Sequence, residues 1–259
     1  MAVTSIEWTH RPVPDGGYAP GYTFNIVWGC TKVSEGCKHC YADTLASRYG
    51  LSLWGPAAER RTLSPAYWRQ PLKWNTLAAH HQHRRNVFCC SMADVFEDHP
   101  VVAQERTKLW SLIEQTPMLN WLLLTKRPQF ILSMVPWKAS PWPGNVWIGT
   151  SVENQRRANE RIPALVQVPA VVRFLSCEPL LESVDLTPWL SALQWVICGG
   201  ESGPGARPMA PEWARSLRDQ CIAAQVPYFF KQWGGRTAKA GGRTLDGRFW
   251  DEMPVALMY

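Results

Sequence analysis

Three cysteines, Cys30, Cys37 and Cys40, fall within eleven residues and are spaced C-x6-C-x2-C. An apolar run, 25–28, precedes them and a helix-like run, 41–46, follows, so the sequence predicts a loop between a strand and a helix. Structural zinc usually takes four protein ligands, whereas iron–sulfur clusters are held by cysteine thiolates, typically four of them. Three local thiolates would leave one iron of a four-iron cluster open to a substrate or cofactor. A zinc site that takes its fourth ligand from elsewhere is the alternative interpretation.

The elements around this loop follow a repeating pattern. Short apolar runs, each ending in small or polar residues, occur at 23–28, 86–90, 121–124, 146–148, 171–175, 195–198 and 228–230. Segments of helical character lie between them, at 65–79, 101–115, 128–134, 154–166 and 211–224. Continuous apolar strands that alternate with helices indicate a parallel sheet covered by helices. The predicted fold class is α/β, a partial (βα) barrel of about six to seven parallel strands with outer helices, and its chemistry should lie at the carboxyl ends of the strands.

The cysteine loop also carries a resemblance. The stretch Trp28–Ser34, with Gly36-Cys37 and Cys40-Tyr41-Ala42, resembles a radical-SAM-like family common in phages and prophages, many of whose members have no known function. The spacing is similar to that of the radical S-adenosylmethionine (SAM) motif, with a longer first interval. The resemblance implies a [4Fe–4S] cluster held by the three cysteines, SAM on the fourth iron, and a 5′-deoxyadenosyl radical that abstracts hydrogen from a substrate. It also implies a partial barrel of the radical-SAM type.

Polar residues at the strand ends are candidate ligands for SAM. Lys126 would bind its carboxylate as a point charge, and His39 stands where relatives often carry an aromatic residue near the adenine. The Gly-Gly-Glu run that relatives often have after the second strand is missing here. The full set of candidates is His39, Ser91, Asp94, Thr125, Lys126, Ser151 and Glu153.

Residues on the later strands should face the substrate. Glu178 and Glu201 are candidates for an acid or base, or for orienting an amine. Cys177 and Cys198 are candidate hydrogen-atom donors or second-site ligands, although a buried cysteine is usually a small hydrophobic residue.

The length of 259 residues suits one large α/β unit. We expect an N-terminal extension at 1–22, a barrel at 23–233 and a C-terminal tail at 234–259. Within the extension, the Pro/Gly-rich piece 11–21 reads as an irregular loop. Within the tail, Asp246-Gly247 predicts a small hairpin, and the tail either caps the barrel mouth or is a surface appendage.

The formal net charge of +6 and the 15 tryptophans are compatible with a polyanionic partner. The resemblance to a phage family suggests a modified thymidine in phage DNA, flipped out of the duplex and rearranged, as by an isomerase. A radical-SAM enzyme acting on a small metabolite or peptide, and a zinc- or cluster-stabilised binding module without enzymatic activity, are the alternatives. Radical-SAM chemistry would also need an electron donor such as flavodoxin or ferredoxin.

The eight cysteines are not read as disulfides, because the N-terminal residues show no secretory signal. No apolar run approaches the roughly 20 residues that span a membrane. We therefore expect a reducing cytoplasm, that of the host if the protein is phage-encoded, where clustered cysteines more often bind metal.

Overall fold

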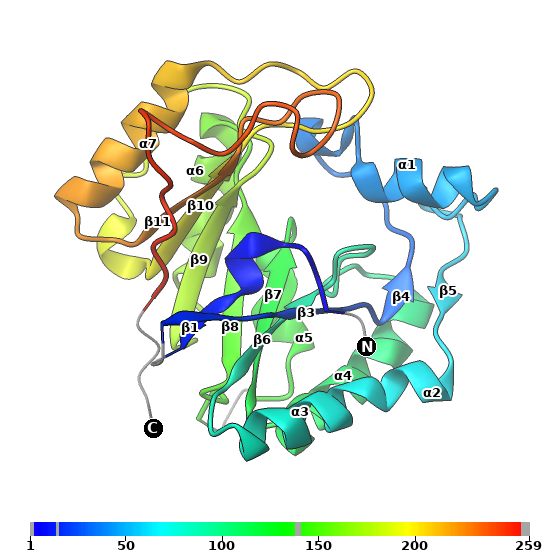
Figure 1. Cartoon of the computed structure of the whole chain (residues 1–259). Coiled ribbons are helices and arrows are strands. Elements are labelled where there is room, and N and C mark those ends of the chain that lie inside the picture. The colour runs from blue at the N-terminus through cyan, green and yellow to red at the C-terminus, as the bar shows by residue number, and fades with distance from the viewer. Residues whose placement is uncertain (1–2, 14–15, 138–140, 255–259) are drawn as a thin grey trace.

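The computed structural model describes residues 3–13, 16–137 and 141–254. Its main feature is a sheet of seven parallel strands in the order β11-β10-β9-β8-β7-β6-β3, curled into a half-barrel (Figure 1). The strands are β3 (Tyr22–Phe24), β6 (Arg85–Cys89), β7 (Leu119–Thr125), β8 (Val146–Ser151), β9 (Val172–Cys177), β10 (Trp195–Gly199) and β11 (Tyr228–Gln232). The predicted partial barrel with outer helices is confirmed.

Helices connect most of the strands; those from α2 to α7 cover the outer face of the sheet, whereas α1 lies beside the sheet and lines the cavity (Figure 1). They are α1 (Tyr41–Arg48), α2 (Pro65–Trp68), α3 (Gln70–His80), α4 (Pro100–Gln115), α5 (Ile131–Met134), α6 (Gln155–Leu165) and α7 (Pro211–Ala223). The Ser64 hydroxyl accepts a hydrogen bond from the Tyr67 amide at the start of α2, and Asn154 caps α6 in the same way at Arg157. Side chains with free oxygen atoms at these positions satisfy amides that the first helical turn leaves unpaired.

Two predicted boundaries near the N-terminus are wrong. The expected strand 23–28 is divided: β3 ends at Phe24, and β4 (Val27–Trp28) pairs instead with β5 (Arg61–Thr62), outside the barrel. The Asn25 side chain accepts a hydrogen bond from the Met92 amide, and the Asn25 amide donates to the Tyr67 hydroxyl, so tertiary partners replace the sheet ladder there. The piece expected to be irregular contains an antiparallel pair, β1 (Arg11–Val13) and β2 (Gly17–Ala19).

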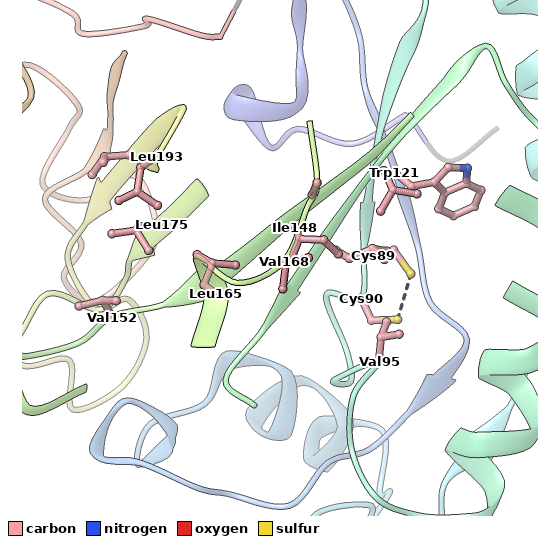
Figure 2. Close-up of a cluster of buried hydrophobic side chains, with 14 of the residues drawn as sticks. Cys89, Cys90, Val95, Trp121, Ile148, Val152, Leu165, Val168, Leu175 and Leu193 are labelled. Carbon is pink, nitrogen blue, oxygen red and sulfur yellow. Dashed lines mark hydrogen bonds between the residues drawn. The ribbon is translucent and has the colours of Figure 1, made fainter. Parts of the chain in front are cut away.

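The sheet separates two hydrophobic clusters because successive side chains of a strand point to opposite faces. On β9, Leu175 and Cys177 belong to the outer cluster beneath the helices, while Val172 and Phe174 belong to the inner cluster. Figure 2 shows part of the outer cluster, where the sulfur atoms of Cys89 and Cys90 lie 3.2 Å apart.

The N-terminal segment packs against the concave inner face. A 3-10 helix, η1 (Glu7–Thr9), contacts β6 and β11 (Figure 1). Trp8 is 2% exposed, and its ring meets Phe88 edge-on, with 4.7 Å between the ring centroids. This indole fills the inside of the half-barrel, so the segment completes the inner cluster.

The C-terminal tail runs beside β11. The Phe230 amide donates to the Trp250 carbonyl oxygen, and Trp250 is 7% exposed. The predicted turn at Asp246-Gly247 is present: Leu245 and Arg248 form an antiparallel bridge, and both turn residues have positive φ, as a type I′ turn requires. None of the described helices is long and apolar enough to span a bilayer.

Candidate active site

A cavity of approximately 770 Å³ lies at the carboxyl ends of the strands. The cysteine loop and the strand-end residues form its upper wall, and the N-terminal segment and part of the tail complete it. The cavity therefore stands where a parallel barrel is expected to carry its chemistry. Its size falls within the range of about 300–1,000 Å³ usual for ligand pockets.

The three clustered cysteines line this cavity. Cys30, Cys37 and Cys40 are partly exposed, whereas the other five cysteines are buried, and all eight are free thiols. Arg127 Nη1 lies 3.7 Å from Cys30 Sγ, and Ser34 Oγ lies 3.7 Å from Cys37 Sγ. The predicted cysteine loop therefore presents three accessible thiols to the cavity of the half-barrel.

The surroundings of the loop shift the pKa values of Cys30 and Cys37 in opposite directions. Burial, followed by the charge of Asp94, raises the pKa of Cys30 to about 12, although Arg127 opposes the shift. Burial alone would raise the pKa of Cys37 too, but the Lys126 charge and backbone hydrogen bonds hold it below its ordinary value. Cys37 is thus the thiol of the three most ready to become a thiolate.

The side chains around the cysteines suit one of the two metal centres that the sequence suggests better than the other. Among the described residues, no group of three or more His, Cys, Asp or Glu side chains is arranged to hold a metal ion. An iron–sulfur cluster makes a different demand, because its thiolates bind separate irons and need not converge on one point. Three free thiols on one loop, beside the cationic groups of Lys126 and Arg127, suit such a cluster by their chemistry.

Buried carboxylates fasten the cysteine loop to the strand ends. Glu153, which is fully buried, accepts hydrogen bonds from Ser34 Oγ (2.9 Å) and Arg161 Nη1 (2.8 Å), and Lys126 Nζ lies 3.5 Å away. A Cβ at Gly36 would stand 2.4 Å from Glu153 Cγ, so the backbone of the loop passes directly over this side chain. Glu153 therefore joins the segment between the first two cysteines to β8.

A second attachment holds the start of the loop. Asp94 accepts hydrogen bonds from Thr125 Oγ1 (2.7 Å) and Arg127 Nη1 (2.8 Å), and Arg127 Nη2 donates to the Thr31 carbonyl oxygen (2.8 Å). The Thr31 amide donates to Glu97 Oε1 (2.8 Å), and Glu97 forms an ion pair with buried Arg60. The residue that follows Cys30 is thus bound through both its carbonyl and its amide.

A third attachment holds the end of the loop. Glu201 accepts from His39 Nδ1 (2.9 Å) and from Arg207 Nη2 (2.5 Å), and Arg207 Nη2 also donates to the Glu35 carbonyl oxygen. Burial alone would raise the pKa of Glu201, but the hydrogen bonds from Arg207 and His39 lower it to about 2. Glu201 is accordingly an ionised anchor, which does not suit the predicted role of a catalytic acid or base.

The predicted site residues therefore fall into three groups. The first group lines the cavity with polar side chains: Ser91, Lys126 and Ser151. The second, Asp94, Thr125, Glu153, Glu201 and His39, is engaged in the attachments of the loop. Glu178 forms the third group: it follows the carboxyl end of β9 and lines the cavity, and its Oε2 lies 2.6 Å from Lys231 Nζ.

The position of Cys177 does not support its predicted role. Its side chain is fully buried in the outer cluster, and burial raises the pKa of its thiol well above the ordinary value. Ser176 and Glu178 line the cavity instead, because they stand on either side of Cys177 in an alternating strand. The candidate Cys198 is likewise buried in the outer cluster. Strict period-two counting along β9 would have indicated this.

Sequence reasoning also missed several residues. Glu97 and Arg60 showed no local signal, since their partner lies on the distant cysteine loop. Arg127 directly follows the predicted pair Thr125-Lys126, so its place at a strand end was a usable signal. Trp8 lies in the segment expected to be an extension of the barrel, so no strand-end signal marks it.

Comparison with known proteins gives the family. The profile of the family described as "Protein of unknown function (DUF5131)" matches residues 3–254, and the chain belongs to this family. No curated protein matches the sequence.

Solved structures show a distant likeness. A structure described as spore photoproduct lyase complexed with dinucleoside spore photoproduct has a TM-score of 0.45 and 12% identity, covering 77% of this chain and 60% of that one. A mutant of that lyase with bound AdoMet and dinucleoside spore photoproduct has a TM-score of 0.47 and 11% identity, covering 84% and 64%. The chain thus spans less than two thirds of these proteins. At these values the likeness defines neither substrate nor reaction for the chain.

Proposed function

We propose that the protein is a radical-SAM enzyme that holds a [4Fe–4S] cluster on Cys30, Cys37 and Cys40. The observation that carries this proposal is the cysteine loop itself. Its three thiols are the partly exposed cysteines of the chain, they line the strand-end cavity, and separate carboxylate attachments fix the loop that bears them. Such fixing is what a cofactor with an open coordination position needs from its protein.

Cys30, Cys37 and Cys40 would hold the cluster, and the cluster, reduced by the electron donor, would supply the one-electron reductive cleavage of SAM to methionine and a 5′-deoxyadenosyl radical. The chain's own residues would orient SAM and exclude water from the radical. Lys126 is 22% exposed at its side chain and would bind the SAM carboxylate. The hydroxyls of Ser91 and Ser151 would bind the amino group or the ribose. Asp94, Glu153 and Glu201 would act indirectly, by holding the loop in place.

The proposed substrate is a thymidine-derived base in DNA, of the kind modified in phages. The basic net charge supports it, as do Lys239 and Arg243 of the tail, which line the same cavity. Contacts of such cations with phosphates would make binding depend on salt. A small metabolite or a peptide would instead show no salt-dependent affinity for DNA. Flavodoxin or ferredoxin is the proposed class of electron donor.

The test is formation of 5′-deoxyadenosine. Protein reconstituted anaerobically with iron and sulfide is mixed with SAM and dithionite, and the product is measured by mass spectrometry. We expect deoxyadenosine from the unsubstituted protein and none from Cys30→Ala, Cys37→Ala or Cys40→Ala. Cys221→Ala is the matched control, since this cysteine is buried away from the cavity and should keep its activity.

Two results would contradict the proposal. Protein that binds one equivalent of zinc and no iron would be a zinc-stabilised binding module. Protein with a full iron and sulfide load that forms no deoxyadenosine, with or without DNA, would hold a cluster of structural role.

A further inference from the structure

The part of the cavity lined by Trp8, Thr23, Phe88 and Leu124, called the floor below, carries polar groups that have no hydrogen-bond partner in the described chain. The Trp8 side chain is almost fully buried, yet its indole Nε1 has no hydrogen-bond partner among the described residues. The Thr23 hydroxyl on β3 is buried in the same way, without a partner in the described chain. Both residues line the cavity, as do Phe88 and Leu124 from the inner face of the sheet. Buried polar groups in native proteins are nearly always hydrogen-bonded, so these two point to a ligand.

The adjoining wall presents a charge pair. Glu178 Oε2 lies 2.6 Å from Lys231 Nζ, and Ser176 Oγ donates to Glu178 Oε1 at 3.2 Å. Ser176 belongs to β9, Glu178 directly follows the last residue of β9, and Lys231 belongs to β11. Strand β10 lies between β9 and β11 in the sheet. At Gly199 of β10 a Cβ would stand 3.0 Å from Glu178 Oε2, so a glycine leaves room for the carboxylate.

This charge pair differs from the attachments of the cysteine loop. The side chains of Glu178 and Lys231 are 14% and 26% exposed, whereas Glu153 is fully buried and Glu201 is 4% exposed at its side chain. Neither Glu178 nor Lys231 has a hydrogen bond to the loop among the contacts of the described residues. Their polar atoms therefore remain available from the cavity.

We propose that this floor and wall form a ligand subsite for a planar heterocycle with a lactam or imide edge, such as a uracil- or thymine-type base. A carboxylate beside an ammonium offers an acceptor and a donor together, which matches an N–H next to a C=O on the ring. The apolar surface of Phe88 and Leu124 suits the face of a flat ring. Trp8 Nε1 and Thr23 Oγ1 are closed to water in the free protein, and they would supply one further donor and one hydroxyl when the ligand displaces the side chains around them.

The proposal rests on the proposed function only where it treats the bound base as the substrate of the radical reaction. Binding of the base itself needs neither the cluster nor SAM. The test is accordingly made on the full chain without iron. Isothermal titration calorimetry compares thymidine with N3-methylthymidine, which keeps the ring and lacks the N–H. Two ligands are titrated in separate arms, a free nucleoside and a single-stranded oligothymidylate. Comparing them shows whether the subsite binds a small molecule or a base within nucleic acid.

We expect thymidine or the oligothymidylate to bind, and N3-methylation to weaken binding by about tenfold or more, since a hydrogen bond to a charged group is lost. Glu178→Gln and Lys231→Met should each reduce affinity by a similar factor, on the order of tenfold. Trp8→Phe, which keeps an aromatic ring and removes the N–H, should weaken binding by about threefold to tenfold. Glu212→Gln, at an exposed position on α7, is the control and should bind as the unsubstituted protein does.

Equal binding of thymidine and its N3-methyl analogue would overturn the proposal, as would unchanged affinity in both Glu178→Gln and Lys231→Met. Absence of saturable binding in both arms would also overturn it. Because deoxyadenosine formation is measured separately, any of these three results would leave the proposed radical chemistry standing. Conversely, protein that binds thymidine but forms no deoxyadenosine would keep the subsite and lose the radical enzyme.

Discussion

The two ends of the cavity use their charged residues differently. At the cysteine end, the carboxylates of Asp94, Glu153 and Glu201 are buried and bonded to arginines of the same chain. At the other end, formed by the floor and the adjoining wall at β9 and β11, the Glu178–Lys231 pair is partly exposed, and the indole N–H of Trp8 has no hydrogen-bond partner in the described chain. The carboxylates at the cysteine end thus hold the cysteine loop in place, whereas the charged side chains at the other end are open to the cavity.

This difference shows how far a polar residue at a strand end indicates ligand binding. The strand ends of a parallel barrel tend to carry such residues. A buried carboxylate that already accepts hydrogen bonds from an arginine, however, has few acceptor positions left for a ligand. The exposed fraction of the side chain and the number of protein partners separate the two roles. We expect substitutions at the two ends to differ in kind, with stability lost at one and affinity lost at the other.

The largest effect should follow Glu153→Ala. The substitution leaves the Arg161 guanidinium buried without its counter-charge, which costs about 3–5 kcal/mol in the free energy of unfolding. Urea denaturation measures it. Glu160→Ala, in an exposed pair with Arg156 and Arg157, is the matched control and should cost about 1 kcal/mol or less. Similar costs at the two positions would show that the buried attachment adds nothing.

An intermediate effect should appear in acid at Glu201. Its pKa is about 2 in the folded protein, below the ordinary value of 4.5, so ionised Glu201 stabilises the fold fully above pH 4.5. This stabilisation, roughly 3 kcal/mol, should be lost as the pH falls from 4.5 toward 2. The measurement is the difference in unfolding free energy between the unsubstituted protein and Glu201→Gln, which should shrink across that range. A difference that stays constant with pH would show that the Arg207 pair does not lower this pKa.

The smallest effect should follow Glu178→Gln. The Glu178–Lys231 pair is partly exposed, so its removal should change the free energy of unfolding by about 1 kcal/mol or less. Thermal unfolding of Glu178→Gln beside Glu153→Ala gives the comparison. A loss of stability as large as that of Glu153→Ala would make Glu178 another structural anchor and remove the distinction between the two ends.

The sequence predicted much of the fold because its signals are local. Six of the seven predicted strands match strands of the sheet within a few residues, since buried parallel strands are continuous apolar runs. The first strand failed because Asn25 bonds to Met92, a residue far along the chain, and this contact draws the backbone away from the sheet. The prediction of an irregular loop at 11–21 was wrong because Gly and Pro indicate a turn but not whether the residues on either side of it pair as strands.

For the site, the sequence by itself determined which residues are candidates for chemistry: three cysteines at a fixed spacing, and the polar residues that end each strand. Only the tertiary structure decided what each of them touches. Glu153 and Glu201 meet arginines, Cys177 turns into the outer cluster, and Trp8 reaches the floor of the cavity from the N-terminal segment. The physical reason is that residue type and periodicity are properties of a short stretch of chain. Pairing and burial depend instead on how the curled sheet brings distant stretches together.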